Sequence, residues 1–452
     1  MKLTKRIVCL LLALVLMLGA FAFAPAAEAA ENDGPSCLHW VSGSGYGIET
    51  TGVPKGKPAH VCYELYTDGK GETKFNDGYD WSYTAVMTIY KPDGSVAHTV
   101  TRNNDDEHWI SFKTSTVGTY TYEIVFSGQL YGTFRGSYTV YDPDKTTVRL
   151  AGANRWDTSL KVADEMKYAL GVEKFDTMII ASGMNFADAL SGSYLASVKK
   201  APILLGWMGD KKYNFLNEEI VEYVKDNLAE NGTVYILGSE TAVPASVDQM
   251  LKGYNVKRLA GKDRFDTNLM ILREAGVKEG EEILVCTATN FADSLSASAT
   301  GKPILLVFNE LGKLYGGQPD YLAGLKSCKF TIIGGENAVS GALANQLGKY
   351  GSVSRLAGAD RFQTSVLVAQ KYFGSVDSAV LAYAWNFPDG LCGGPLAFAQ
   401  KCPLILTMDR YDALAVQYVA EKGIGVGTVL GSGELISDGT VDRIFHSKIF
   451  VK

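Results

Sequence analysis

The sequence predicts a multidomain protein, in which an all-β sandwich is followed by three doubly wound α/β repeats. The chain has 452 residues, which is too long for a single domain of ordinary size. Residues 31–145 contain short runs of alternating polar and apolar residues. Between residues 146 and 452, four sequence anchors recur three times in the same order, which indicates three related units.

Residues 1–29 have the pattern of a secretory signal peptide. Three basic side chains precede an apolar run at 7–23, and Ala27-Glu28-Ala29 offers a small-x-small cleavage site. The run is at the lower limit for crossing a membrane, and no later stretch approaches 18 consecutive apolar residues. We therefore expect a secreted protein that has no membrane anchor once the signal is removed.

The segment 31–145 reads as antiparallel β structure. Runs at 84–90 and 119–126 alternate in polarity, and Pro92-Asp93-Gly94 marks a turn. The tyrosine-rich run at 118–122 is similar to a strand of immunoglobulin-like domains, so we expect an immunoglobulin-like β-sandwich. Cys37 and Cys62 lie in this exported segment and are candidates for a disulfide.

The repeat is defined by four anchors that keep their order. The first, Arg-Leu-Ala-Gly-x-x-Arg-[Trp/Phe]-[Asp/Gln]-Thr, occupies 149–158, 258–267 and 355–364. The second is Asn-Phe-x-Asp at 185–188, 290–293 and 386–389, and the third is an apolar run after proline at 202–205, 303–306 and 403–406. A glycine follows two apolar residues at 238, 334 and 431. We expect repeats at 146–254, 255–351 and 352–452.

Each repeat alternates buried strands with helices. In the first copy we expect strands at 177–181, 202–205, 233–237 and 256–260, with helices at 188–198, 214–228 and from about residue 244. Strands that are apolar on both faces are typical of parallel sheets covered by helices on both sides. Asp188 is expected to cap the helix that it precedes.

Recurring polar residues are the candidates for ligand binding. Guanidinium groups recognise phosphate and carboxylate, and Asn-Phe-x-Asp lies between a strand and a helix, where α/β sheets bind ligands. The alternative is structural: the second arginine of each motif pairs with a repeat aspartate, and that aspartate caps a helix. The polymer-binding candidates are Arg149, Arg155, Asn185, Asp188, Arg258, Arg264, Asn290, Asp293, Arg355, Arg361, Asn386 and Asp389.

Composition and motifs argue against several functions. With 43 Lys and Arg against 49 Asp and Glu, the chain lacks the basic character of a nucleic-acid-binding protein. It contains no His-Glu-x-x-His, no nucleophile elbow and no phosphate-binding loop. We therefore expect no catalytic residue, no cofactor and no metal, and a protein that is not an enzyme.

The three copies resemble the cell wall binding repeat type 2 family of Gram-positive surface proteins. The resemblance implies Rossmann-like repeats packed as an intramolecular pseudo-trimer and non-covalent attachment to the wall. The implied partner is an anionic cell-wall polysaccharide or teichoic-acid-like polymer, with peptidoglycan as a further possibility. The third copy departs from the pattern at Gln363 and Pro388, so binding roles transfer more readily to the first two copies.

The β-sandwich would then be a module displayed at the cell surface, as an adhesin or an S-layer-like structural coat, with an unknown ligand. The alternative function is that of a cell-wall-modifying hydrolase of the amidase kind, or of its activator.

Overall fold

The computed structural model describes residues 36–42, 52–66, 82–103, 108–129, 131–208 and 214–452. The expected signal peptide at 1–29 lies outside these residues. The chain divides into two compact units, one drawn from residues up to Ser137 and the other consisting mainly of Tyr138–Lys452. The second unit also includes Thr51–Pro58 and Lys113–Tyr120, so it begins before the expected repeat boundary at residue 146.

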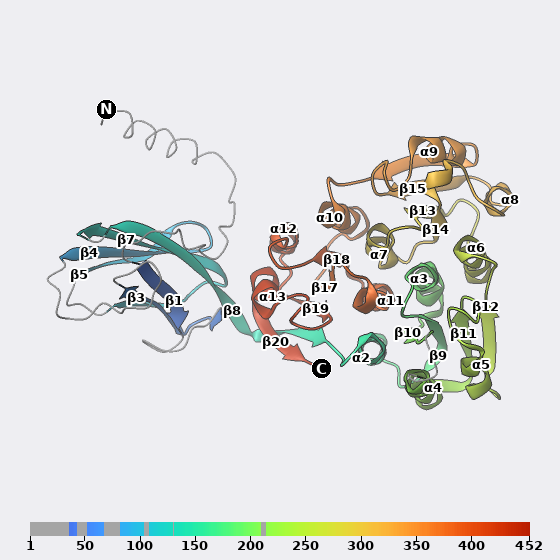
Figure 1. Cartoon of the computed structure of the whole chain (residues 1–452), viewed down its shortest axis with the longest axis horizontal. Helices are drawn as coiled ribbons and strands as arrows, with labels where there is room; N and C mark the ends of the chain where they lie inside the picture. The colour runs from blue at the N-terminus through green and yellow to red at the C-terminus, as the bar shows by residue number, and fades with distance from the viewer. Residues whose placement is uncertain (1–35, 43–51, 67–81, 104–107, 130, 209–213) are drawn as a thin grey trace. The chain divides into compact units, whose positions relative to one another are not determined.

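The first unit is built from β-strands, most of which are labelled in Figure 1. One sheet has the order β1 (Ser36–Ser42), β3 (Pro58–Tyr66), β6 (Trp109–Lys113). Strand β4 (Tyr83–Tyr90) pairs antiparallel with β5 (Val96–Asn103) and with β7 (Gly118–Gly128). Every second residue of β4 is buried, as the alternating sequence predicts, so the expected antiparallel strands are confirmed here.

The expected disulfide between Cys37 and Cys62 is wrong. In the antiparallel pair β1–β3, Cys37 lies opposite Leu65, and Cys62 lies opposite Trp40. The two cysteines are therefore offset by three residues, roughly 10 Å along the strands at about 3.3 Å per residue. An odd offset also places their side chains on opposite faces of the sheet, which disulfide geometry does not allow.

The second unit contains two parallel four-stranded sheets, one in each of the first two repeats, and the third repeat has four parallel strands in the same order at one end of a nine-stranded sheet. Their orders are β10-β9-β11-β12, β14-β13-β15-β16 and β18-β17-β19-β8. The strands of the first repeat are β9 (Phe175–Ser182), β10 (Ile203–Gly206), β11 (Leu228–Leu237) and β12 (Asn255–Leu259). Those of the second are β13 (Glu282–Thr287), β14 (Ile304–Val307), β15 (Cys328–Ile333) and β16 (Gly351–Leu356). The third contributes β17 (Ser378–Tyr383), β18 (Leu404–Thr407) and β19 (Val426–Leu430).

Helices connect these strands, as the apolar pattern predicts. The first repeat has α2 (Arg155–Leu170), α3 (Ala187–Lys199), α4 (Phe215–Asn227) and α5 (Ala245–Met250). The second has α6 (Arg264–Ala275), α7 (Ala292–Ser298), α8 (Gln318–Ala323) and α9 (Gly341–Leu347). The third has α10 (Arg361–Tyr372), α11 (Gly393–Ala399), α12 (Ala413–Lys422) and α13 (Asp438–Phe445). Short 3₁₀ turns occur at η2 (Asn309–Leu311) and η3 (Pro388–Gly390).

The sheet of the third repeat is completed by β8 (Gly132–Leu150), a strand that precedes the first repeat. Its residues Val148–Leu150 pair in parallel with β19, in the place that β12 and β16 occupy in the other two sheets. The last strand, β20 (Ser447–Val451), pairs with β8 as well, and so does the short β2 (Gly52–Pro54). The beginning and the end of the repeat region are therefore joined in one sheet.

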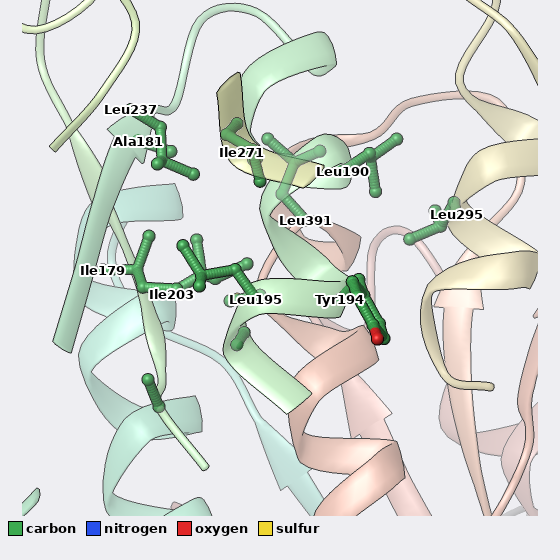
Figure 2. Packing of buried hydrophobic residues seen from close by; sticks show 14 of the residues in the cluster. Ile179, Ala181, Leu190, Tyr194, Leu195, Ile203, Leu237, Ile271, Leu295 and Leu391 are labelled. Carbon is green, nitrogen blue, oxygen red and sulfur yellow. The ribbon is translucent and has the colours of Figure 1, made fainter. Parts of the chain in front are cut away.

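The three repeats pack through a repeating pair of helices. Helix α3 contacts α6, α7 contacts α10, and α11 contacts α2, so that each repeat meets the next one in turn. Figure 2 shows Leu190, Tyr194 and Leu195 of α3 among buried side chains that include Leu295 and Leu391 of the other repeats. One apolar core thus runs through all three repeats.

Candidate functional site

The first anchor closes a loop in the same way in each repeat. The glycine N–H donates to the threonine hydroxyl, from Gly152 to Thr158 (3.1 Å), from Gly261 to Thr267 (3.0 Å) and from Gly358 to Thr364 (3.0 Å). The side chain of the residue before the threonine accepts a hydrogen bond from the backbone N–H of the residue after the glycine. Asp157, Asp266 and Gln363 all make this bond. The substitution of glutamine in the third copy therefore leaves the loop intact.

The first arginine of each motif is turned inward and holds the neighbouring strand end. Its guanidinium donates to the carbonyl of the glycine anchor, from Arg149 to Gly431 (3.0 Å), from Arg258 to Gly238 (2.8 Å) and from Arg355 to Gly334 (2.7 Å). Arg149 also binds the Ile436 carbonyl and Asp438, and its side chain is only 3% exposed. Arg258 pairs with Asp248, and Arg355 binds the Val339 carbonyl. The contacts of these three arginines are those of structural residues, and Arg149 in particular is out of reach of a polymer.

The Asn-Phe-x-Asp anchors lie at the carboxyl ends of β9, β13 and β17. In each sheet, the next strand along the chain pairs with one edge of this strand, and the strand after that pairs with its other edge. The direction of the chain therefore reverses here, and the carboxyl end of this strand is the topological switch point of the sheet. Phe186, Phe291 and Phe387 bring the three loops together, because their ring centroids lie 5.7–6.4 Å apart. Three separate switch points therefore meet around one aromatic cluster.

The second arginine of each motif reaches across to these loops. Its Nη1 donates to the carbonyl two residues before the asparagine, from Arg155 to Gly183 (2.9 Å), from Arg264 to Ala288 (2.6 Å) and from Arg361 to Ala384 (2.7 Å). Arg264 and Arg361 also lie over the phenylalanine of the preceding repeat, at 5.7 Å from Phe186 and 5.6 Å from Phe291.

Each of these arginines acts electrostatically on an aspartate of another repeat. Burial raises the pKa of Asp188 to about 6, and Arg264 lowers it in opposition. Burial likewise raises the pKa of Asp293 to about 6 against the influence of Arg361. Burial also raises the pKa of Asp389, whereas a hydrogen bond with the Thr158 side chain and the charge of Arg155 lower it. These charges therefore act between repeats rather than within one.

The aspartates do not cap their helices, and that expectation is wrong. The N-cap of α3 is Phe186, and Asp188 lies in the first turn without a side-chain capping bond. Asp293 has the same place in the first turn of α7. Asp389 lies in η3, a short 3₁₀ helix that begins at Pro388. Each carboxylate instead occupies the space beside the glycine anchor, where a Cβ would clash with it.

The asparagines are the most accessible of the predicted residues. Asn185, Asn290 and Asn386 are all exposed at the ends of their strands. By contrast, the run after proline is core, since Ile203–Leu205 are 0% exposed and the N–H of Leu205 donates to Ser159 of α2 (3.1 Å). Asparagine amides and partly exposed guanidinium groups are thus what the loops offer to a ligand.

Sequence reasoning missed exposed aromatic side chains at these loops. Trp385 directly precedes Asn386 and is 51% exposed, and Tyr411 after β18 is 53% exposed. A sequence signal existed, because the third copy alone has an aromatic residue directly before the asparagine. In the β segment, by contrast, Tyr83 is buried and Trp109 is half-buried.

Two further features are absent from the residues that the structure describes. These residues contain no cluster of three His, Cys, Asp or Glu side chains that could hold a metal ion. In the same residues, no helix combines the length and the apolar character needed to cross a membrane.

The fold and the three convergent loops define a triple-repeat α/β binding protein. The chain belongs to the family described as Cell wall binding domain 2 (CWB2), which matches it at residues 149–248, 258–344 and 355–441. It is thus a cell-wall-associated protein that carries three cell wall binding repeats.

Two bacterial relatives are similar in sequence to part of this chain. It is 25% identical over 311 residues to the N-acetylmuramoyl-L-alanine amidase LytC of Bacillus subtilis (strain 168), covering 67% of this chain and 58% of the amidase. It is 27% identical over 297 residues to the amidase enhancer of the same organism, covering 64% and 39% of the two chains. The chain therefore spans less than two thirds of the length of either relative.

Solved structures share the fold. Cwp8 from Clostridium difficile matches with a TM-score of 0.58 and 24% identity, over 75% of this chain and 60% of that one. Cwp6 from the same organism matches with a TM-score of 0.57 and 19% identity, over 90% and 68%.

Proposed function

We propose that this protein is secreted and attaches non-covalently to the Gram-positive cell wall by binding an anionic wall polymer through its three repeats. A polysaccharide or a teichoic-acid-like polymer has the required charge, and peptidoglycan is the less favoured target. The observation that carries the proposal is the meeting of three switch-point loops, each with an exposed asparagine beside an arginine.

The cyclic contacts α3–α6, α7–α10 and α11–α2 support the proposal that the repeats form an intramolecular pseudo-trimer. The joining of Val148–Leu150 to the third repeat supports it too, because this strand closes the series. The pseudo-trimer would present the three loops to one polymer together, so that binding at one loop raises the local concentration of polymer at the others.

We further propose that the β-strands of the first unit form an immunoglobulin-like module displayed at the surface, with an adhesive or S-layer-like structural role and no catalytic activity. The names of the two Bacillus subtilis relatives keep a wall hydrolase or its activator as the alternative. Release of reducing sugars or amino groups from walls incubated with the protein would favour that alternative.

The direct test is co-sedimentation of the whole protein with purified Gram-positive walls, before and after chemical removal of the anionic polymers. Binding that disappears on removal is the expected result. Retention on stripped walls would assign binding to peptidoglycan, and absence of binding to intact walls would refute the anchoring function.

A further inference from the structure

Two exposed aromatic rings stand beside the loop of the third repeat. Trp385 and Tyr411 both pack on Phe362, a ring of α10 that is 4% exposed. Tyr411 stacks on it at 5.3 Å with an angle of 9° between the rings, and Trp385 meets it edge-on at 6.3 Å. Because one buried ring supports both, their positions are set before any ligand arrives.

The arginine of the same repeat fixes the indole further. The Arg361 guanidinium carbon lies 4.3 Å from the centre of the Trp385 ring, a close cation–π contact. Although Arg361 and Phe362 both contact the indole, Trp385 remains 51% exposed, so part of its ring is open to a ligand. Asn386 follows directly and is exposed too, so an apolar ring face, an amide and a guanidinium lie together.

The described residues of the other two repeats, which leave out 209–213, lack this arrangement. Met184 and Thr289 occupy the position of Trp385. The aromatic pair of the first repeat, Trp156 and Trp207, is half-buried, and Phe265 of the second repeat is buried. Within the part of the chain that the structure describes, exposure of two preorganised rings is therefore particular to the third repeat, the copy whose sequence departs from the other two.

This combination suits a sugar ring. A pyranose presents a flat patch of C–H groups that packs on an aromatic face, surrounded by hydroxyl or acidic groups that amide and guanidinium groups can bind. We propose that Trp385 and Tyr411 form a stacking platform for a sugar residue of the wall polymer, which makes the third repeat its main carbohydrate contact. This inference rests on the proposed wall-binding function.

The test uses the whole protein, purified walls, and the anionic polysaccharide extracted from those walls. Trp385→Thr places the residue of the second repeat at this position, so the loop keeps a side chain that the fold already accommodates. We expect this variant and Tyr411→Ala each to bind walls about 3- to 10-fold more weakly, as for the loss of one aromatic contact. Trp385→Phe retains an aromatic face and is expected to lose less.

The matched control is Tyr168→Ala, since Tyr168 is an 81% exposed aromatic residue on α2 outside the loops. It should bind as the unaltered protein does. The extracted polysaccharide should also shift the tryptophan fluorescence of the unaltered protein by a component that Trp385→Phe lacks.

The outcomes separate this inference from the proposed function. Wall binding that is unchanged in Trp385→Thr and Tyr411→Ala would overturn the stacking platform and leave the anchor intact. Absence of wall binding by the unaltered protein would overturn both. An equal loss in Tyr168→Ala would also overturn the inference, because the effect would then not be specific to the platform.

Discussion

The two arginines of each repeat motif are six residues apart and have different surroundings. Arg149 is buried and binds carbonyl groups, whereas Arg155 reaches a loop and acts on Asp389 of another repeat. The sequence presented both as equal candidates, because one chain shows which residues recur but not which face solvent. Folding contacts repeat as faithfully as binding contacts do, so recurrence alone could not separate the two roles.

The raised pKa of Asp188 leads to a prediction about how stability depends on pH. Its pKa is about 6 in the folded protein, because burial disfavours the charged form, and about 4 in an unfolded chain. Between these values the folded state holds a proton that the unfolded state has released, so this group's contribution to stability falls as pH rises.

We therefore expect the free energy of unfolding of the unaltered protein, minus that of Asp188→Asn, to decrease from about pH 4 to pH 7 and then level off. Urea unfolding at several pH values measures this difference. His446, whose pKa burial lowers to about 4, titrates in both proteins and cancels in the subtraction. A difference independent of pH would contradict the account of Asp188.

At the scale of elements, a contact between the end of a strand and an aspartate at the start of a helical segment explains why each repeat has a glycine at the anchor position. Gly238, Gly334 and Gly431 all have positive φ, between 93° and 105°. In each, the carboxylate of an earlier aspartate, Asp188, Asp293 or Asp389, fills the space of a Cβ. The sequence showed the anchors and predicted the strands and helices between them, but this contact joins residues that are 41 to 50 positions apart and had no local signal.

Gly238→Ala tests that contact, with Gly253→Ala as its control. Gly253 also has positive φ (99°), but nothing lies within 4 Å of its added Cβ. We expect Gly253→Ala to cost about 1–2 kcal/mol of unfolding free energy through backbone strain alone. Gly238→Ala should cost about 1–3 kcal/mol more, through overlap with the Asp188 carboxylate and with the Cβ of Ala242.

Chemical denaturation measures both costs. In an Asp188→Ala background the cost of Gly238→Ala should fall, because the closest overlapping group is gone, but it should stay above that of Gly253→Ala, because the Cβ of Ala242 still lies 2.8 Å from the added Cβ. Equal costs for the two glycine variants in the unaltered background would refute the role of the carboxylate.

At the scale of the whole molecule, the strand that begins the repeat region pairs with a strand of the last repeat. The Arg-Leu-Ala-Gly motif begins each of the three repeats, and the structure places the strand that carries its first copy, at the end of β8, in the sheet of the third repeat. This pairing joins residues about 280 positions apart, and the same motif begins every copy, so no local feature could assign it. The meeting of Phe186, Phe291 and Phe387 depends on the same closure and was equally beyond prediction from local sequence.

The most direct test of the central claim is the affinity for walls of a protein that carries Asn185→Ala, Asn290→Ala and Asn386→Ala together. These side chains are exposed, so the variant should fold, which circular dichroism and thermal unfolding would verify. A matched variant with Asn231→Gly changes an exposed asparagine with positive φ outside the loops. We predict that the triple variant loses most of its binding to walls that carry their anionic polymers, while Asn231→Gly binds normally. Full binding by a correctly folded triple variant would contradict the claim that these three loops hold the polymer.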